Sequence, residues 1–580
     1  MQALTAIPSR VLAATGILLA LLLAVAAAPV HAATSDGNGY LVVTPDRGFL
    51  GNDEIRDAFD QFAKERNAEL LFVTDKRSET VLDQSLADLR QHGAKQVAVL
   101  PLVLSSADAR WQLAQGWLKA REDKGNLAIA PPYGASYLAV EDLSARLRVL
   151  HTDKRKLLLL GYGAASPEDA TTMAAALQRM AGFASDLPAD AIHAAVYPAR
   201  KAADEKTMRK QVTDVVKSAR DSVVVPVALA PRADSMMSFS GWFRRDLPDD
   251  SQLVTSPIAT TDALAQWMQR AATEADMRFA PLQADRIGIV ALVHGADWFW
   301  NRDIRQALAP VAARYKLAYA FSMADPPVVE RAVHKLEGEG VRAIVVVRGF
   351  GMADSFLPTV QRMIGADVER GGAPHAGHDM SMGMMMNHGH GGHASLAAAP
   401  RIRSALPMVT VGGVEDDPLF AKALLQNARS VSKGNPAKET VILVAHGQGD
   451  DKANRKWLDL LASLAQQMRA AGGDAFHAIE TATWREDWPD KNKVEVKRVR
   501  DMVEQASRDG GRVLIVPARI NGRGAADRYL KCLDYGWSEG FAQTPYFARW
   551  FEQEIGRGVD KLNAAYGTDS PVNTSHGSYH

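Results

Sequence analysis

A repeated order of strands and helices constrains the fold of this chain more than any other feature of its sequence. In four segments, a short apolar run ends in a glycine-containing turn and is followed by a helical stretch, a second strand, another helix and a third strand. The opening strands are 39–43, 156–160, 287–293 and 440–445, and the third strands are 96–101, 222–226, 343–347 and 512–517. Strands that alternate with helices in this way predict parallel sheets with crossover helices.

The apolar runs also predict how these units are arranged. Continuous apolar strands of this length suit a sheet that is buried on both faces. The chain has 580 residues, of which 47% are hydrophobic, and this is enough for several cores. We therefore predict an α/β protein with four Rossmann-like parallel-sheet units, paired into two bilobal domains at 36–275 and 284–565. Open parallel sheets bind ligands beyond the carboxyl ends of their strands.

The N-terminus has the layout of a secretory signal peptide. Arg10 precedes an apolar stretch at 11–25, and Val30-His31-Ala32 offers small residues where a signal peptidase cleaves. The alternative is a retained membrane anchor, but the apolar stretch is shorter than the roughly 20 residues that span a bilayer. We predict a signal peptide at 1–32, cleavage near Ala32, a periplasmic protein, and no stable membrane anchor after cleavage.

Composition excludes several classes of protein and site. The chain has 67 basic and 67 acidic residues, which argues against nucleic acid as a partner, because such binders carry a basic excess. Cys532 is the one cysteine, so an intrachain disulfide and a multi-cysteine metal site are excluded. Any metal site must use His, Met or carboxylate ligands.

Histidines occupy matching places in the third and fourth units. His294 and His446 each follow the opening strand and precede a glycine. Neutral imidazole binds Co, Ni, Cu, Zn and Fe, so we predict that both residues are metal ligands and catalytic groups of one shared site. Glu480, predicted to end the second strand of the fourth unit, is the candidate carboxylate for the metal shell or for proton transfer. Asp325 holds a comparable place in the third unit, where a helix cap is the alternative role.

The motifs around these residues resemble those of a known family. In the fourth unit they are His446-Gly447 with Asp450, Ala453-Asn454-Arg455, Ala478-Ile479-Glu480, and Val516-Pro517-Ala518-Arg519-Ile520. The third unit repeats the first element as Val293-His294-Gly295 with Asn301, and the first unit has Asn52 at the same place. This pattern resembles the sirohydrochlorin cobaltochelatases, which are class II tetrapyrrole chelatases, and their ferrochelatase relatives.

The resemblance implies a function as well as a fold. It implies two bilobal chelatase-like domains and a lyase reaction of cobalamin biosynthesis, in which cobalt or a related divalent metal enters a tetrapyrrole such as sirohydrochlorin. It implies that His294, His446 and Glu480 act on the metal. The turns after the third strands contain no His, and the first two units have Pro45-Asp46 and Tyr162 where His stands later. The domain at 36–275 is therefore the degenerate copy.

An insert at 371–400 differs in composition from the rest of the chain. Five His and five Met lie between 375 and 393 in a Gly-rich, aromatic-free stretch. His-rich tracts are typical of metal binding, and thioether sulfur favours Cu(I). We predict a segment that captures or delivers copper, nickel or cobalt, followed much later by a tail at 566–580. The predicted ligands are His375, His378, Met380, Met382, Met384, His388, His390 and His393.

Three hypotheses about function remain open from the sequence. The first is an exported chelatase. The second is a non-catalytic periplasmic protein on the same scaffold that binds copper, nickel, cobalt or a tetrapyrrole. The third, a sugar- or amino-acid-binding protein, gives no reason for the paired His or the insert. Aromatic residues flank the His turns and either wall a flat tetrapyrrole or belong to the core; they are Trp298, Phe299, Trp300, Trp484 and Trp488.

Overall fold

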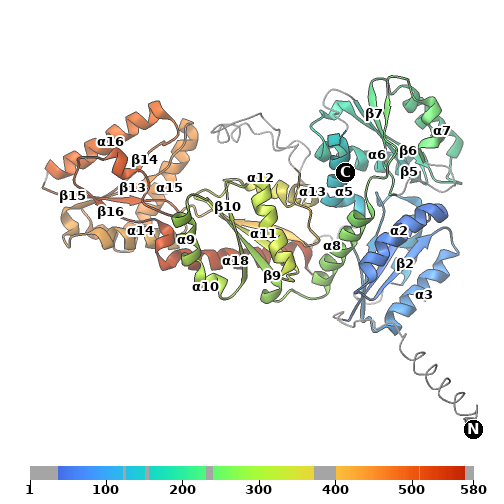
Figure 1. The fold of residues 1–580 in the computed structure, drawn as a ribbon, viewed down its shortest axis with the longest axis horizontal. Coiled ribbons are helices and arrows are strands. Elements are labelled where there is room, and N and C mark those ends of the chain that lie inside the picture. Colours follow the sequence, from blue (N-terminus) through green and yellow to red (C-terminus); the bar gives the residue numbers. More distant parts are fainter. Residues whose placement is uncertain are drawn as a thin grey trace, which may run out of the picture.

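The computed structural model describes residues 37–121, 126–149, 156–229, 239–370, 400–508 and 510–567. Within them the chain forms four parallel sheets of four strands each, with helices between the strands. The prediction of an α/β protein with four Rossmann-like units is confirmed. Figure 1 shows the fourth unit at one end of an elongated molecule, the third in the middle, and the first and second together at the other end.

The first two units have the same strand order. The first contains β1 (Asn38–Pro45), α2 (Gly48–Ala63), β2 (Ala68–Val73), α3 (Ser78–Gln91), β3 (Gln96–Pro101), α4 (Ala109–Ala120), β4 (Leu127–Ile129) and α5 (Tyr137–Val149). The second contains β5 (Lys156–Ala164), α6 (Pro167–Ala184), β6 (Ile192–Pro198), α7 (Glu205–Lys217), β7 (Ser222–Pro226), β8 (Gln252–Leu253) and α8 (Thr261–Phe279). Their sheets run β2-β1-β3-β4 and β6-β5-β7-β8.

The third and fourth units repeat this order. The third contains β9 (Ile287–Val293), α9 (Trp298–Ala307), α10 (Ala309–Ala312), β10 (Lys316–Phe321), α11 (Pro326–Gly338), β11 (Ala343–Gly349), α12 (Leu357–Met363), α13 (Ala366–Glu369), β12 (Met408–Gly412) and α14 (Pro418–Val431). The fourth contains β13 (Glu439–Ala445), α15 (Asp451–Ala470), β14 (Ala478–Thr483), α16 (Pro489–Arg508), β15 (Arg512–Pro517), α17 (Ala526–Tyr529), β16 (Gly536–Trp537) and α18 (Pro545–Tyr566). Their sheets run β10-β9-β11-β12 and β14-β13-β15-β16.

Local sequence explains where the strands and helices begin. Every residue of β9 is buried, as expected for a central strand covered on both faces. Several helices start at a side chain that accepts a hydrogen bond from a first-turn N–H group, which satisfies a donor that the helix itself leaves free. These capping residues include Asp108, Ser166, Thr260, Asp297, Asp417 and Asp450.

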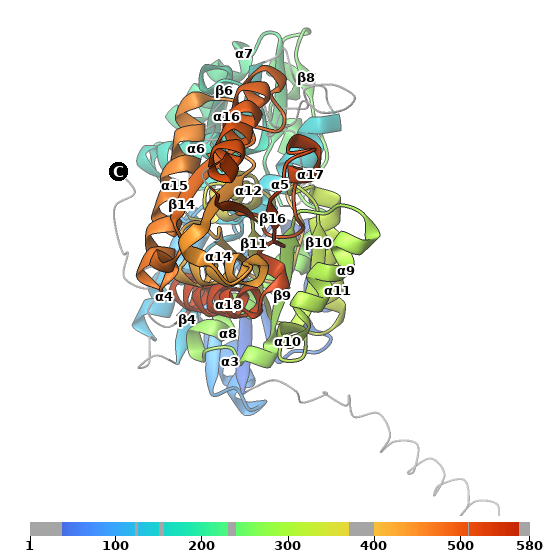
Figure 2. The ribbon, with the colours of Figure 1, turned by 90° about the vertical axis from the view of Figure 1, so that its left-hand side faces the viewer.

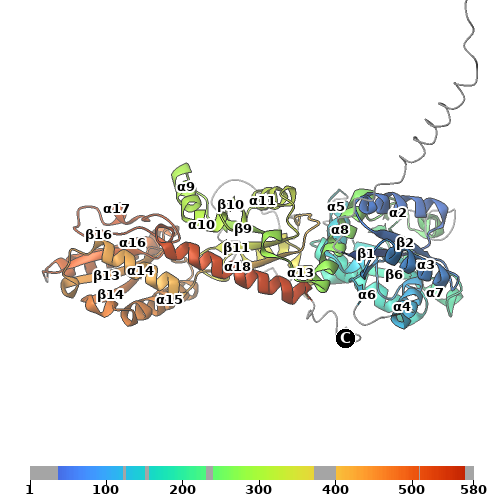
Figure 3. The same ribbon diagram turned by 90° about the horizontal axis from the view of Figure 1, so that it is seen from below.

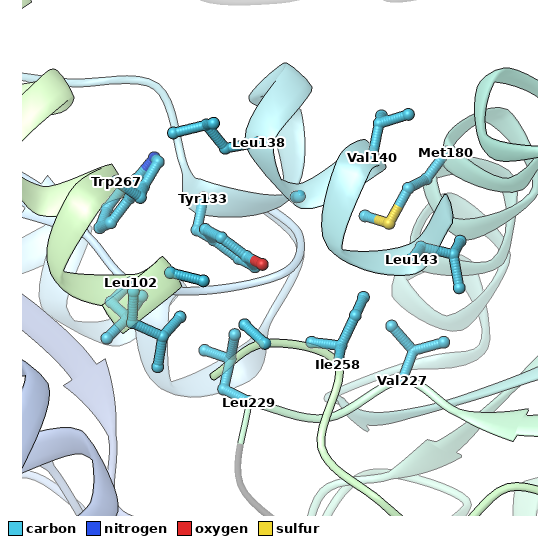
Figure 4. Packing of buried hydrophobic residues seen from close by; sticks show 14 of the residues in the cluster. Leu102, Tyr133, Leu138, Val140, Leu143, Met180, Val227, Leu229, Ile258 and Trp267 are labelled. Carbon is cyan, nitrogen blue, oxygen red and sulfur yellow. The ribbon is translucent and has the colours of Figure 1, made fainter. Parts of the chain in front are cut away.

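In the first domain, the last helix of each unit packs on the other unit. Helix α5 follows the first sheet but packs against α6 of the second unit, and α8 follows the second sheet but packs against α2 and β3 of the first. Figure 4 shows the resulting shared core, in which Trp267 of α8 meets Tyr133 edge to face at 5.6 Å between ring centroids. Met180 and Val227 of the second unit belong to the same core as Leu102 of the first.

The second domain repeats this exchange of helices. Helix α14 follows the third sheet but packs against α15 and β15, whereas α18 follows the fourth sheet and packs against β11 and β12. Figure 3 shows α18 running from the fourth unit along the third, and the end view in Figure 2 shows α14 beside it. Gly558 of α18 lies directly on Val345, where a Cβ atom would collide with the strand. Burial of Phe547, Trp550 and Phe551 contributes about 1.5–3 kcal/mol each.

Buried ion pairs join the two domains. Arg401 is fully buried and contacts Glu141 of α5 at 3.0 Å and Asp367 of α13 at 2.7 Å. Arg403 pairs with Asp142 at 2.7 Å, and the Asp142 carboxylate also accepts a 2.6 Å hydrogen bond from the Tyr133 hydroxyl. These contacts attach the segment that follows the His/Met-rich insert to the first domain.

Three predicted segments lie mostly outside the described residues. These are the signal peptide at 1–32, the insert at 371–400 except for its last residue, and the tail at 566–580 beyond residue 567. In the part of the chain that the structure describes, no helix combines the length and the apolar character required to cross a bilayer.

Replacing Arg401 with Ala should destabilise the protein by about 3–5 kcal/mol, because the buried Glu141 carboxylate loses its 3.0 Å partner and keeps only Arg148 at 3.8 Å. Urea unfolding followed by circular dichroism measures the change as a lower transition midpoint. Arg77→Ala is the control. Arg77 and Asp75 form an exposed ion pair, so its loss should leave the midpoint unchanged. Equal midpoints for both variants would contradict this account of the interface.

Candidate functional site

The strand-end turns of three units share one structural device. An asparagine near the start of the following helix accepts a hydrogen bond from a backbone N–H of the turn. The residues are Asn52, Asn301 and Asn454, with distances of 2.7, 3.3 and 3.0 Å. Because Asn52 does so in a unit without a strand-end His, the asparagine has a structural role that does not depend on metal or substrate.

His446 lies directly after β13 and has a partner on each ring nitrogen. Its Nδ1 is 3.0 Å from the carbonyl oxygen of Gly447, and its Nε2 is 3.2 Å from Oδ2 of Asp487. A carbonyl oxygen only accepts hydrogen bonds, so Nδ1 carries a proton. Nε2 faces the Asp487 carboxylate at a distance that suits a hydrogen bond, so the imidazole and the carboxylate are neighbours at this strand end.

His294, directly after β9, belongs to the same region. Burial lowers the pKa of His294 below its ordinary value of 6.5, and the positive charges of Arg519 and His446 lower it further. The ring is therefore neutral at pH 7, with a lone pair free to bind a cation. His446 and Arg519 belong to the fourth unit. Asn521 of that unit donates a 3.1 Å hydrogen bond to the backbone carbonyl oxygen of Trp300 in the third, so the two lobes meet beside these strand ends.

The loop between β14 and α16 holds Asp487 in place. Arg485, whose backbone lies in the left-handed region at φ 50°, donates to the carbonyl oxygens of Gln448 and Gly449 at 2.7 and 2.5 Å. Trp488 packs so closely on Gly449 that a side chain at this glycine would collide with the indole. Asp487 lies between these two anchors.

Arg519, two residues after β15, adds a positively charged side chain to the region. Its guanidinium is 3.2 Å from Glu486, the neighbour of Asp487. The site thus combines two imidazoles, two carboxylates and one guanidinium from separate strand ends. Within the described residues, no group of three or more His, Cys, Asp or Glu side chains has the spacing to enclose a metal ion.

The aromatic residues divide into three sets. Trp300 contacts the ring of His294 and Trp488 that of His446, with centroid distances of 5.7 and 6.1 Å. Trp484 is buried in the core of the fourth unit. Trp298 and Phe299, by contrast, are 75% and 63% exposed.

The predicted strand end at Glu480 is wrong. Strand β14 continues to Thr483, and Glu480 is an exposed residue within it, opposite Ile442. Since Ile442 precedes His446 by four residues, Glu480 is about 13 Å from the turn at ~3.3 Å per residue. The three residues after Glu480 remain in the strand because Thr481 and Thr483 are β-branched and suit a pleated sheet, while the small Ala482 is buried in the core.

Asp487 is the carboxylate that sequence reasoning missed. The signal was present, since an acidic pair follows the second strand of the unit at the sheet edge where ligands bind. Asp325 stands at the N-cap position of α11 and is exposed, and its side chain makes no capping hydrogen bond.

The first domain uses the equivalent positions for internal contacts. Tyr162, expected in a turn after 156–160, instead lies within β5, which continues to Ala164, and it packs with Phe239 and Trp242. Arg47 lies 3.7 Å from the buried Asp108, whose backbone forms a bridge to Ala164 across the two units. Side chains of the domain itself therefore occupy these strand ends.

The eight His and Met candidates of the insert lie outside the described residues. A cavity of about 590 Å³ is lined by α9, α10 and the start of α18, including Gln306, Arg549 and Glu552, and contains none of the predicted site residues.

Comparison with known proteins leaves the family open. No protein-family model matches the chain, and a search of curated proteins finds no match to it. The fold therefore defines the chain only as an α/β protein of four parallel-sheet units.

Replacing Arg519 or His446 with Gln should raise the pKa of His294, because each change removes a positive charge that disfavours the imidazolium. An NMR titration of the imidazole protons measures this shift. Arg523→Gln is the control, since Arg523 pairs with Glu539 at the surface. If neither Arg519→Gln nor His446→Gln moved the His294 titration, the two lobes would not share an electrostatic site.

Proposed function

We propose that this protein is a chelatase-like enzyme that inserts a divalent metal, with cobalt as the first candidate, into a tetrapyrrole such as sirohydrochlorin. The observation that carries the proposal is the pairing of His446 with Asp487 at 3.2 Å, at an edge where the fourth unit contacts Trp300, the residue that packs on His294. Two strand-end imidazoles from two pseudo-equivalent lobes are suited to hold one metal ion between them. The motif resemblance to the cobaltochelatase family supports the same choice of reaction.

The chemistry of insertion assigns roles to these residues. Insertion exchanges two pyrrole protons for one divalent ion. His446 Nε2 and the Asp487 carboxylate, 3.2 Å apart, would hold the incoming ion, and His294 of the other lobe would supply a neutral nitrogen ligand once the ring is bound. Once the metal has moved to the macrocycle, the imidazole of His446 and the carboxylate of Asp487 are free to accept the two protons. Asp487 replaces Glu480 in the role that the sequence had suggested.

A second candidate function is a non-catalytic metal-binding protein on the same scaffold. It is favoured by the five His and five Met between residues 375 and 393, which suit capture of copper, nickel or cobalt. Both proposals include export to the periplasm by the N-terminal signal peptide.

A metal-insertion assay separates enzyme from binding protein. Purified mature protein is mixed with sirohydrochlorin and Co(II), and separately with Ni(II) or Fe(II), while the absorbance change is followed. We expect insertion above the uncatalysed rate, and a His294→Ala/His446→Ala double variant should lose it. If the intact protein gave no more than the uncatalysed rate, the enzyme proposal would be abandoned.

Asp487→Asn should lower Co(II) affinity and insertion by about tenfold or more, because it removes a charged ligand beside His446. Isothermal titration calorimetry measures the affinity. Glu480→Gln is the matched control, since this exposed carboxylate in the same unit is remote from the turn. Loss of Co(II) binding in the Glu480 variant alone would reverse the two assignments.

Deleting residues 371–399 should remove stoichiometric Cu(I) binding, because the deletion takes away all eight predicted His and Met ligands of the insert. Inductively coupled plasma mass spectrometry after dialysis measures bound copper. Cobalt insertion at the turns should survive the deletion. Unchanged copper content would show that the insert is not the copper ligand.

A further inference from the structure

Large apolar side chains are exposed in one place beside the proposed site. Six such side chains are exposed in the described chain, and Val81, Val215 and Val494 lie singly on α3, α7 and α16. The other three are Trp298 and Phe299, at the start of α9, and Met323, just after β10. Single exposed apolar residues are common, but a group that includes two aromatic rings marks a binding surface.

These three residues belong to one sheet edge. Strands β9 and β10 are neighbours and are paired through to Val293 and Phe321. The turn after β9 lies directly on Phe321, because a Cβ atom at Gly295 would be 2.9 Å from Phe321 Cβ. The exposed side chains are therefore carried by two adjacent strand ends, next to His294.

One arginine lies beside the aromatic rings. The guanidinium of Arg302 is 5.2 Å from the centre of the Phe299 ring; it is half-exposed and also pairs with Asp303 at 2.9 Å. Arg519 is close enough to lower the pKa of His294. Aromatic faces stack on flat conjugated rings, and guanidinium groups bind carboxylates. A planar ring with carboxylates on its periphery matches both features.

We propose that Trp298, Phe299 and Met323 form the docking face for the planar polycarboxylate ring, with Arg302 at its margin. This inference rests on the proposed function, because it names where that substrate lies relative to His294. Trp300 of the same helix packs on the His294 ring and keeps its orientation, so the face and the metal ligand are parts of one element.

A binding titration tests the docking face apart from catalysis. Metal-free sirohydrochlorin is titrated into the mature protein under anaerobic conditions, and binding is followed by tryptophan fluorescence and ring absorbance. The variants are Trp298→Ala/Phe299→Ala, Arg302→Gln and, as a control for an exposed apolar residue elsewhere, Val494→Ala. Co(II) affinity is measured for each by calorimetry, and sedimentation velocity reports the oligomeric state.

We expect the double aromatic variant to raise the Kd for sirohydrochlorin by about tenfold or more, the Arg302 variant by a smaller factor, and the Val494 variant not at all. Co(II) affinity should be unchanged. Equal ring affinity in the double variant and the intact protein would overturn the docking face, as would the absence of ring binding by the intact protein. The docking face would also be overturned if the double variant lost a dimer while its ring affinity stayed unchanged, because the face would then bind a second copy of the chain.

A different result would contradict the proposed function without contradicting the docking face. If the intact protein bound sirohydrochlorin through Trp298 and Phe299 but inserted no metal, the docking face would stand, and the protein would be a tetrapyrrole binder.

Discussion

The exchange of helices within each domain is the constraint on which the rest of the structure depends. A parallel sheet buried on both faces needs helices on both, and the last helix of each unit covers its neighbour instead of its own sheet. Helices α8 and α18 contribute their largest apolar side chains to these shared cores. Neither unit of a pair is therefore complete alone. The close contact of Gly558 with Val345 shows how tightly α18 fits against the third sheet.

The same exchange fixes the candidate site. With α18 held on β11 and β12, and α14 on the fourth unit, the turns after β9 and β13 have a set relation to each other. Burial between the packed elements lowers the pKa of His294, and the charges of Arg519 and His446 lower it further. Around each turn, short-range contacts then set the details: the asparagine hydrogen bond, the Arg485 contacts to the turn carbonyls, and the packing of Trp488 on Gly449.

The two domains use one architecture for different purposes. In the first, Tyr162 and the Arg47–Asp108 pair fill the strand ends, and α5 contributes Glu141 and Asp142 to the interface with the second domain. The arginines that they bind follow the His/Met-rich insert in sequence. The first domain thus binds the segment that directly follows the insert, at Arg401 and Arg403. The second domain carries the two strand-end imidazoles.

The sequence alone determined the class of fold, the number of units and the positions of the His turns, because these follow from local apolar runs and from glycine after each strand. It did not determine the exchange of helices, since an amphipathic helix looks the same whichever sheet it covers. The sequence also pointed to Glu480 as the carboxylate of the metal site. The end of a strand cannot be located from residue types that are found in strands and loops alike. Only the tertiary structure extended β14 to Thr483 and brought Asp487 to His446, through contacts between residues far apart in the chain.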